Sequence, residues 1–300
     1  MKQRIGLGVA VFVVVTFAVS AVGFWAHHHF AIAYWVFDLG SFGPFAGGLA
    51  VLLVNRRLHL GARWVPGLGF NVQVVRRSVL AGAIALAIVL SCVQFYTFFR
   101  WRMKPIDLPM VPHPLALPGD SGTIFLLVAL GMLIGLTLQE FGFRTVLQPT
   151  LRTRYSVPVT GVIVGVIWGT WSWPAWQSVL QRFDRTGGPL GLVLFLGAHY
   201  VMTISISLLL VALHNNRMNS GQWASAVAFR LLFSLGFFLI LDEEQGMWQP
   251  MFAISLACAA AAAVSLYYYR RAALAQRGWS ARDKDVDPAA SGGESVQLPS

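Results

Sequence analysis

Charged residues are scarce in this chain of 300 residues, at 11% of the total, whereas soluble proteins carry about 25%. Apolar residues make up 56% of the chain, and the mean hydropathy is +0.64. A water-soluble fold of this length could not bury so much hydrocarbon. The composition therefore excludes a soluble domain and indicates a protein whose solvent is the lipid bilayer.

Cysteine is also scarce, since only Cys92 and Cys258 occur and both lie in apolar runs. Two such thiols exclude a disulfide framework and a thiolate metal cluster. The formal net charge of +10 at pH 7 first suggests a nucleic-acid partner. No stretch resembles a nucleic-acid-binding module, so we expect no nucleic-acid partner and look for a topological cause of the charge.

Eight apolar stretches, each about 20 residues long, predict an all-α, polytopic transmembrane helical bundle. Their approximate bounds are 5–26, 31–54, 78–99, 121–144, 157–180, 189–214, 222–243 and 251–270. From Trp279 onward, Ala, Ser, Gly, Asp and Pro dominate. The sequence thus predicts a transmembrane bundle over residues 1–278 and a disordered cytoplasmic tail over residues 279–300.

The basic residues predict the orientation of the bundle, because cytoplasmic segments are enriched in Lys and Arg. An even number of spans places both termini on the same side of the membrane. With the N-terminus inside, the inner segments hold 16 Lys and Arg and the outer loops hold 5. We therefore expect a multi-pass protein of the bacterial plasma membrane with both termini cytoplasmic, and membrane lipids among its partners.

Glycines four residues apart predict close helix packing within the membrane. Gly43 and Gly47 form one such pair, and Gly161, Gly165 and Gly169 form a longer series. Packing inside one bundle is the favoured interpretation, and a homodimer is the alternative.

Few ionisable residues lie within the predicted spans, where each costs several kcal/mol unless it has a partner or a purpose. They are Asp38, Glu140, Arg144, His199 and Arg230. Glu140 and Arg144 are four residues apart and so share one helix face as an acid–base pair. Alone, that pair indicates a structural contact near the interface. His199 fits a neutral, hydrogen-bonded histidine of the bundle, with a displaced catalytic imidazole as the alternative.

Three segments together resemble the motifs of the CAAX-protease and bacteriocin-processing family, also called CPBP or Abi. The segment Gln139–Pro149 is similar to its first motif, Glu-Glu-x-x-x-Arg, and Trp168–Pro174 is similar to its second, an aromatic residue followed by His. Ala226–Ser234 lies where the third motif, His-x-x-x-Asn, would fall. The resemblance covers roughly residues 121–240 and implies a CPBP-like membrane core with intramembrane endopeptidase ancestry.

The resemblance also implies which positions carried the chemistry. In the family, paired glutamates and two histidines activate water, directly or through a metal. This chain retains Glu140 and Arg144. The substituted positions are Gln139 for the first Glu, Ser172 for the first His, Arg230 for the second His and Ser234 for the Asn. In family members, aromatic residues such as Trp168 and Trp171 wall the substrate cavity, whereas such residues are otherwise core or belt residues.

These substitutions remove the means of activating water. A general base works best when it titrates near the working pH, and neighbouring arginines favour the ionised, less basic form of Glu140. Zinc needs about three protein ligands, of which Glu140 alone is left, so we expect no metal and no cofactor. Because no His or Lys is predictably within reach of Ser172, a serine nucleophile is not expected either.

We therefore expect an ion pair between Arg230 and Glu140, with Gln139, Ser172 and Ser234 as neutral hydrogen-bonding neighbours. The favoured function is a CPBP-like membrane protein that has lost its water-activating residues and acts by binding or scaffolding another membrane or envelope protein. One alternative is an intramembrane endopeptidase that uses Glu140 with rearranged partners. The other is lipid or anion binding, because the side chains of Arg144, Arg230 and Glu140 sum to +1.

Overall fold

The computed structural model describes residues 2–29, 39–57, 72–103, 121–173, 188–213, 221–240 and 248–285. All regular secondary structure within these ranges is helical. The helices are α1 (Lys2–His29), α2 (Phe42–Arg57), α3 (Val72–Met103), α4 (Ser121–Glu140), α5 (Gln148–Arg152), α6 (Val157–Trp171), α8 (Gly188–Leu213), α9 (Gly221–Ile240) and α10 (Trp248–Asp285). A 3₁₀ turn, η1 (Leu39–Ser41), precedes α2, and a π-helix, η3 (Phe141–Leu147), joins α4 to α5.

Each of the eight predicted apolar stretches contains a helix, so the predicted all-α membrane bundle is confirmed. Within the described ranges, four helical segments are long and apolar enough to cross a bilayer: Gly6–Ala26, Val74–Cys92, Gly188–Leu213 and Met251–Ala272. Three shorter apolar segments accompany them: Leu39–Asn55, Val157–Trp171 and Trp223–Gly236. The protein is therefore a multi-pass membrane protein.

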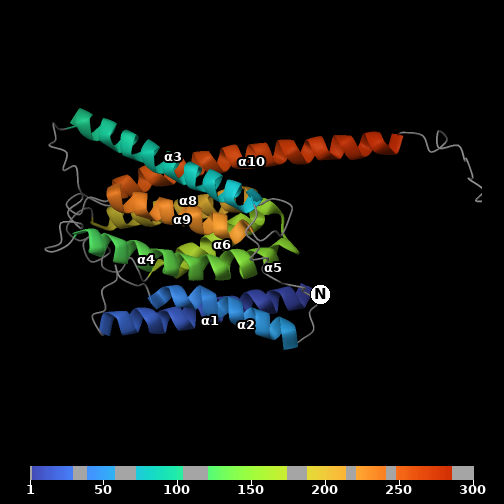
Figure 1. Cartoon of the computed structure of the whole chain (residues 1–300), viewed down its shortest axis with the longest axis horizontal. Helices are drawn as coiled ribbons and strands as arrows, with labels where there is room; N and C mark the ends of the chain where they lie inside the picture. Colours follow the sequence, from blue (N-terminus) through green and yellow to red (C-terminus); the bar gives the residue numbers. More distant parts are fainter. Residues whose placement is uncertain are drawn as a thin grey trace, which may run out of the picture.

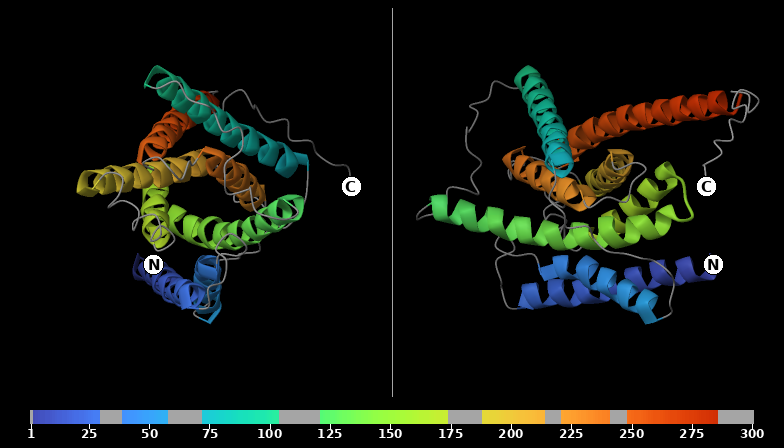
Figure 2. Two further views of the ribbon diagram at one scale, coloured as in Figure 1. Left: turned by 90° about the vertical axis from the view of Figure 1, so that its left-hand side faces the viewer. Right: turned by 45° about the vertical axis from the view of Figure 1, so that its right-hand side comes forward.

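The helices form layers that are visible in two orientations (Figures 1 and 2). The antiparallel pair α1 and α2 lies on one side, α4 and α6 come next, and α3 and α10 lie on the opposite side. The closest helix pairs are α8 with α10, α3 with α9, α1 with α2, and α6 with α8. The start of α1, the short helix α5 and the far end of α10 all lie toward the right-hand side of Figure 1.

The predicted glycine series mark close approaches inside the bundle. A Cβ atom added to Gly43 would collide with Ser20 of α1. A Cβ at Gly165 would likewise collide with the backbone of Ile204 in α8. Packing within one bundle, the favoured interpretation, is therefore confirmed for these helix pairs. The homodimer stays a prediction.

Two predicted boundaries differ from the structure. The fifth apolar stretch was expected to extend to residue 180, but α6 ends at Trp171. A proline disfavours helical geometry in the residue before it, and Trp173 precedes Pro174, so the sequence supplies a reason for the early stop. At the other end of the chain, α10 continues to Asp285, past the predicted start of the tail at residue 279. Residues 286–300 and Asp38 lie outside the described residues.

Candidate functional site

The π-helix η3 follows directly after Glu140, within the segment that resembles the first family motif. π-Helical turns are rare and occur often at functional sites. Helix α2 approaches this segment closely, because a Cβ at Gly142 would collide with the carbonyl group of Pro44. Pro149, which has no N–H to donate, lies in the first turn of α5, where regular α-helix resumes. A small residue and a proline thus delimit the widened turn.

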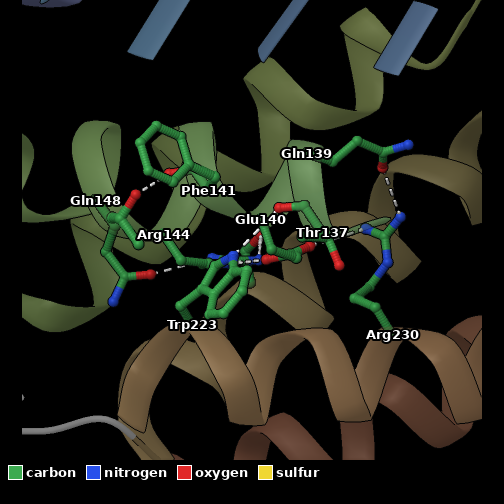
Figure 3. A network of polar contacts seen from close by, with 10 residues as sticks. Thr137, Gln139, Glu140, Phe141, Arg144, Gln148, Trp223 and Arg230 are labelled. Carbon is green, nitrogen blue, oxygen red and sulfur yellow. Dashed lines mark hydrogen bonds and ion pairs between the residues drawn. The ribbon is translucent and has the colours of Figure 1, made fainter. Parts of the chain in front are cut away.

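Glu140 lies at the centre of a buried ion-pair cluster (Figure 3). Its side chain is 1% exposed. Arg144 Nε donates to Glu140 Oε2 at 2.9 Å, one turn along the same helical segment. Arg230 Nη1, from α9, lies 3.5 Å from Glu140 Oε1. The predicted ion pair between Arg230 and Glu140 is therefore present, and each carboxylate oxygen faces a guanidinium group.

Helix α9 is held beside α4 in a register that allows this contact. Trp223, two turns before Arg230, donates its indole N–H to the carbonyl oxygen of Thr137 at 3.2 Å. Arg230 also lies over the ring of Trp168 in α6, with 3.9 Å between its Cζ atom and the ring centroid. A guanidinium over an indole face is a favourable cation–π arrangement, which strengthens when water is excluded.

Gln139 connects the cluster to the N-terminal helices. Its Oε1 atom accepts a hydrogen bond from Arg230 Nη2 at 3.1 Å. Its Nε2 atom donates to Ser41 Oγ of η1 at 2.7 Å. Gln139 is thus a neutral hydrogen-bonding neighbour of Arg230, as predicted. Ser41 was missed, since no local pattern links residues 98 positions apart in the chain.

Arg144 has two further acceptors that the prediction missed. Its Nη1 atom donates to Gln148 Oε1 at 3.2 Å, and its Nη2 atom donates to Ser207 Oγ of α8 at 3.3 Å. The four-residue spacing between Arg144 and Gln148 could have indicated the first contact. Ser207 gives no such signal, because its place in the cluster depends on how α8 packs.

Trp171 belongs to a neighbouring part of the core. It donates its indole N–H to Ser20 Oγ of α1 at 2.6 Å, and its ring packs edge-on against Phe143 at 5.8 Å. Trp168 and Trp171 are both buried in the main apolar core. This agrees with the interpretation of these tryptophans as core residues, and their role as cavity walls stays a prediction.

Ser172 takes part in a second polar contact at the end of α6. Its Oγ atom lies 3.1 Å from His199 Nε2 and donates to the carbonyl oxygen of Gly169 at 3.1 Å. The expectation that no histidine comes within reach of Ser172 is wrong, because α6 pairs with α8 along its length and brings His199 to it. Ser172 therefore bonds to His199 and not to the Glu140 cluster.

The carbonyl oxygen of Gly169 indicates which nitrogen of His199 carries the proton beside Ser172. It also lies 3.1 Å from His199 Nε2, and a carbonyl oxygen can only accept. The proton of the imidazole therefore belongs on Nε2, where it cannot serve as a base toward Ser172. His199 is thus a hydrogen-bonded histidine of the bundle, which donates to the carbonyl oxygen of Gly169 near the end of α6. Ser234, half-buried one turn beyond Arg230, has no hydrogen bond to the cluster among the described residues.

The charge of the cluster is unbalanced. Two guanidinium groups face one carboxylate, which leaves a formal charge of +1 among the side chains of Glu140, Arg144 and Arg230. The carboxylate is held by both arginines, so a water molecule would have to displace one of them to be activated there. In the part of the chain that the structure describes, no three His, Cys, Asp or Glu side chains gather where they could hold a metal ion.

The chain is similar to proteins of staphylococci, although no protein-family profile matches it. Lysostaphin resistance protein A from two strains of Staphylococcus epidermidis is 24% identical over 251 residues, which cover 83% of this chain and 58% of that protein. The protein of the same name from Staphylococcus haemolyticus is 24% identical over 255 residues and is covered to 62%. This chain therefore spans about three-fifths of the length of the curated relatives it matches.

Proposed function

We propose that this chain is a bacterial plasma-membrane protein of the CPBP type, with both termini cytoplasmic, in which an ion-pair cluster has replaced the hydrolytic centre. It acts by binding another membrane or envelope protein and not by cleaving peptides. The motif-like segments around Glu140, Ser172 and Arg230 support the family. The similarity to Lysostaphin resistance protein A, which extends over 83% of the chain, also supports it.

The observation that carries the proposal is the double engagement of Glu140. Arg144 contacts one of its oxygens at 2.9 Å and Arg230 approaches the other to 3.5 Å. Both carboxylate oxygens are thus taken up by guanidinium groups, and a water molecule would have to displace one of them to reach the carboxylate. Gln139 and Ser172 are neutral, and neither supplies a second base beside Glu140 in the part of the chain that the structure describes. The cluster is suited to fixing α4 against α9 and poorly suited to activating water.

The name of the relatives supports our choice of an envelope partner. That name links those proteins to resistance to lysostaphin. We extend to this chain a role in the cell envelope, exercised through a partner held in or at the membrane. The family fold then serves as a scaffold whose core is stabilised by polar contacts, and function is carried by its surfaces.

The test compares peptide cleavage with partner capture. Purified full-length protein and the variant Glu140→Ala are incubated with peptide substrates of CPBP-type proteases, and the bound metal is analysed. The expected result is no cleavage above background by either protein, and a stoichiometric envelope protein that co-purifies with the wild type. Cleavage by the wild type that disappears in Glu140→Ala, but survives in the control Ser207→Ala, would refute the scaffold.

A second candidate function is an intramembrane endopeptidase with rearranged residues. The 3.1 Å contact between Ser172 and His199 favours it, because serine and histidine form nucleophile–base pairs in many hydrolases. It requires an unprotonated Nε2, which would place two acceptors, Nε2 and the Gly169 carbonyl oxygen, against each other. We therefore rank it below the scaffold. Ser172→Ala should leave the background rate of peptide hydrolysis unchanged, whereas loss of a measurable rate would establish the endopeptidase.

A further inference from the structure

Two exposed arginines lie where α10 leaves its predicted membrane span. The candidate span covers Met251–Ala272, and Arg270 and Arg271 occupy its last turn, both exposed. Tyr267 and Tyr268 precede them, 59% and 63% exposed, with 5.6 Å between their ring centroids. Exposed tyrosines at the end of a span are typical of the level of the lipid headgroups. The four side chains lie within about one helical turn of each other.

The charge of the helix dipole does not explain these arginines. Basic residues often stabilise the last turn of a helix, where carbonyl groups are left without partners. Here α10 continues to Asp285, and at 1.5 Å per residue that is about 20 Å beyond Arg271. Arg270 and Arg271 therefore lie within the helix, where every carbonyl near them accepts from the following turn.

Ion pairing does not explain them either. An acidic partner on the same helix would stand three or four residues away. The residues around the pair are apolar or neutral, and the first acidic residue after Arg271 is Asp283. In the described ranges, neither arginine takes part in an ion pair, a side-chain hydrogen bond or a cation–π contact. Two guanidinium groups thus remain available at the membrane surface.

Arginines at the end of α5 offer a comparison at the same end of the bundle. Arg152 Nη1 donates to the carbonyl oxygen of Tyr155 at 3.1 Å, and Arg154 lies 5.3 Å from the Tyr155 ring centroid. These two are engaged by the protein itself. The far end of α10, in contrast, extends beyond the other helices toward the right in Figure 1 and in the right-hand view of Figure 2. The pair on α10 is open to lipid along the exposed side of that helix.

We propose that Tyr267, Tyr268, Arg270 and Arg271 form a binding site for the phosphate of an anionic phospholipid headgroup. The tyrosines fix the depth of α10 in the interface, and the guanidinium groups donate charge-assisted hydrogen bonds to the phosphate oxygens. The argument is one of charge complementarity, since the arginines have no acidic partner in the described protein. It does not depend on the proposed function, because the site lies on α10, outside the motif-bearing helices.

The experiment measures lipid selectivity of the full-length protein. The wild type is reconstituted into nanodiscs that contain equal amounts of phosphatidylglycerol and phosphatidylcholine, and retained lipids are counted by native mass spectrometry after partial delipidation. The wild type should retain phosphatidylglycerol preferentially. Arg270→Gln with Arg271→Gln should reduce the enrichment about fivefold per arginine. Arg270→Lys with Arg271→Lys should keep most of it, because the charge is preserved.

The matched control is Arg152→Gln with Arg154→Gln, which removes the same charge from the same end of the bundle. It should retain the enrichment of the wild type, because these arginines contact Tyr155. An equal loss in the control would overturn the site and assign the effect to overall charge. Unchanged enrichment in the α10 glutamine variant would also overturn it. If inorganic phosphate displaces the lipid more than chloride does at equal ionic strength, the proposed lipid ligand would be wrong, and the site would bind a soluble anion.

Discussion

Loss of Glu140 should destabilise the protein more than loss of Arg230. In Glu140→Met, two buried guanidinium groups lose their shared counter-charge, since Arg144 and Arg230 are 2% and 7% exposed. Leaving buried charge uncompensated in this way costs about 3–5 kcal/mol of unfolding free energy. Arg230→Met instead removes the surplus positive charge, while Glu140 keeps its 2.9 Å contact to Arg144. Its cost should be about 1–2 kcal/mol, mainly from the lost stacking on Trp168.

The two changes should therefore couple. In the double variant Glu140→Met with Arg230→Met, Arg144 remains alone and the formal charge is +1, as in the wild type. Its destabilisation should fall short of the sum of the single variants by about 1–3 kcal/mol. Ser207→Ala, which removes one neutral acceptor of Arg144, is the control and should cost about 1 kcal/mol.

Two buried thiols allow the free energy of unfolding to be measured. Cys92 and Cys258 are free and buried, so a thiol-reactive fluorescent dye labels them when the bundle unfolds. Denaturant titrations of the full-length protein in mild detergent then give the free energies. Additive single effects, or a Glu140→Met variant as stable as Ser207→Ala, would refute the argument that the two arginines depend on this carboxylate.

Three further predictions use the same dye assay. In the wild type, Arg230 Nη2 lies 3.1 Å from the amide oxygen of Gln139. Gln139→Glu places a carboxylate there and brings the cluster to zero net charge, so it should raise the melting temperature. A decrease would contradict the charge count. Gly165→Ala should destabilise by about 1–3 kcal/mol because the methyl group meets the backbone of α8. Gly197→Ala, with nothing within 4 Å, should instead stabilise by a few tenths of a kcal/mol, and equal effects at both glycines would be inconsistent with the packing. Trp168→Leu should cost about 3 kcal/mol, and the loss should shrink by half or more in an Arg230→Met background.

The sequence predicted the bundle well because apolar length alone determines which segments enter a bilayer. It also predicted the pairing of Glu140 with Arg144, which depends only on helical spacing. Arg230 was placed against Glu140 because a charge within a span needs a partner and the family motifs suggested which helices meet. These inferences share a feature: each rests on local pattern or on the cost of an isolated charge.

The rest depends on how the helices pack. The contact between Ser172 and His199 exists because α6 and α8 run side by side, which no spacing within either helix indicates. No residue pattern distinguishes the π-helix after Glu140 from an α-helix, so its first residues were predicted as the regular end of a membrane span. Ser41 and Ser207 are small polar residues in apolar surroundings, of a kind that occurs many times in this chain. Only their neighbours distinguish them.

The hydrogen bond between Ser41 and Gln139 has a consequence for biogenesis. Ser41 is synthesised 98 residues before Gln139. At ribosomal rates of about 5–20 residues per second, Gln139 is therefore added roughly 5–20 seconds after Ser41. The contact between η1 and α4 can therefore form only after α4 has been synthesised, so the docking of these two elements is a late step in the assembly of the bundle.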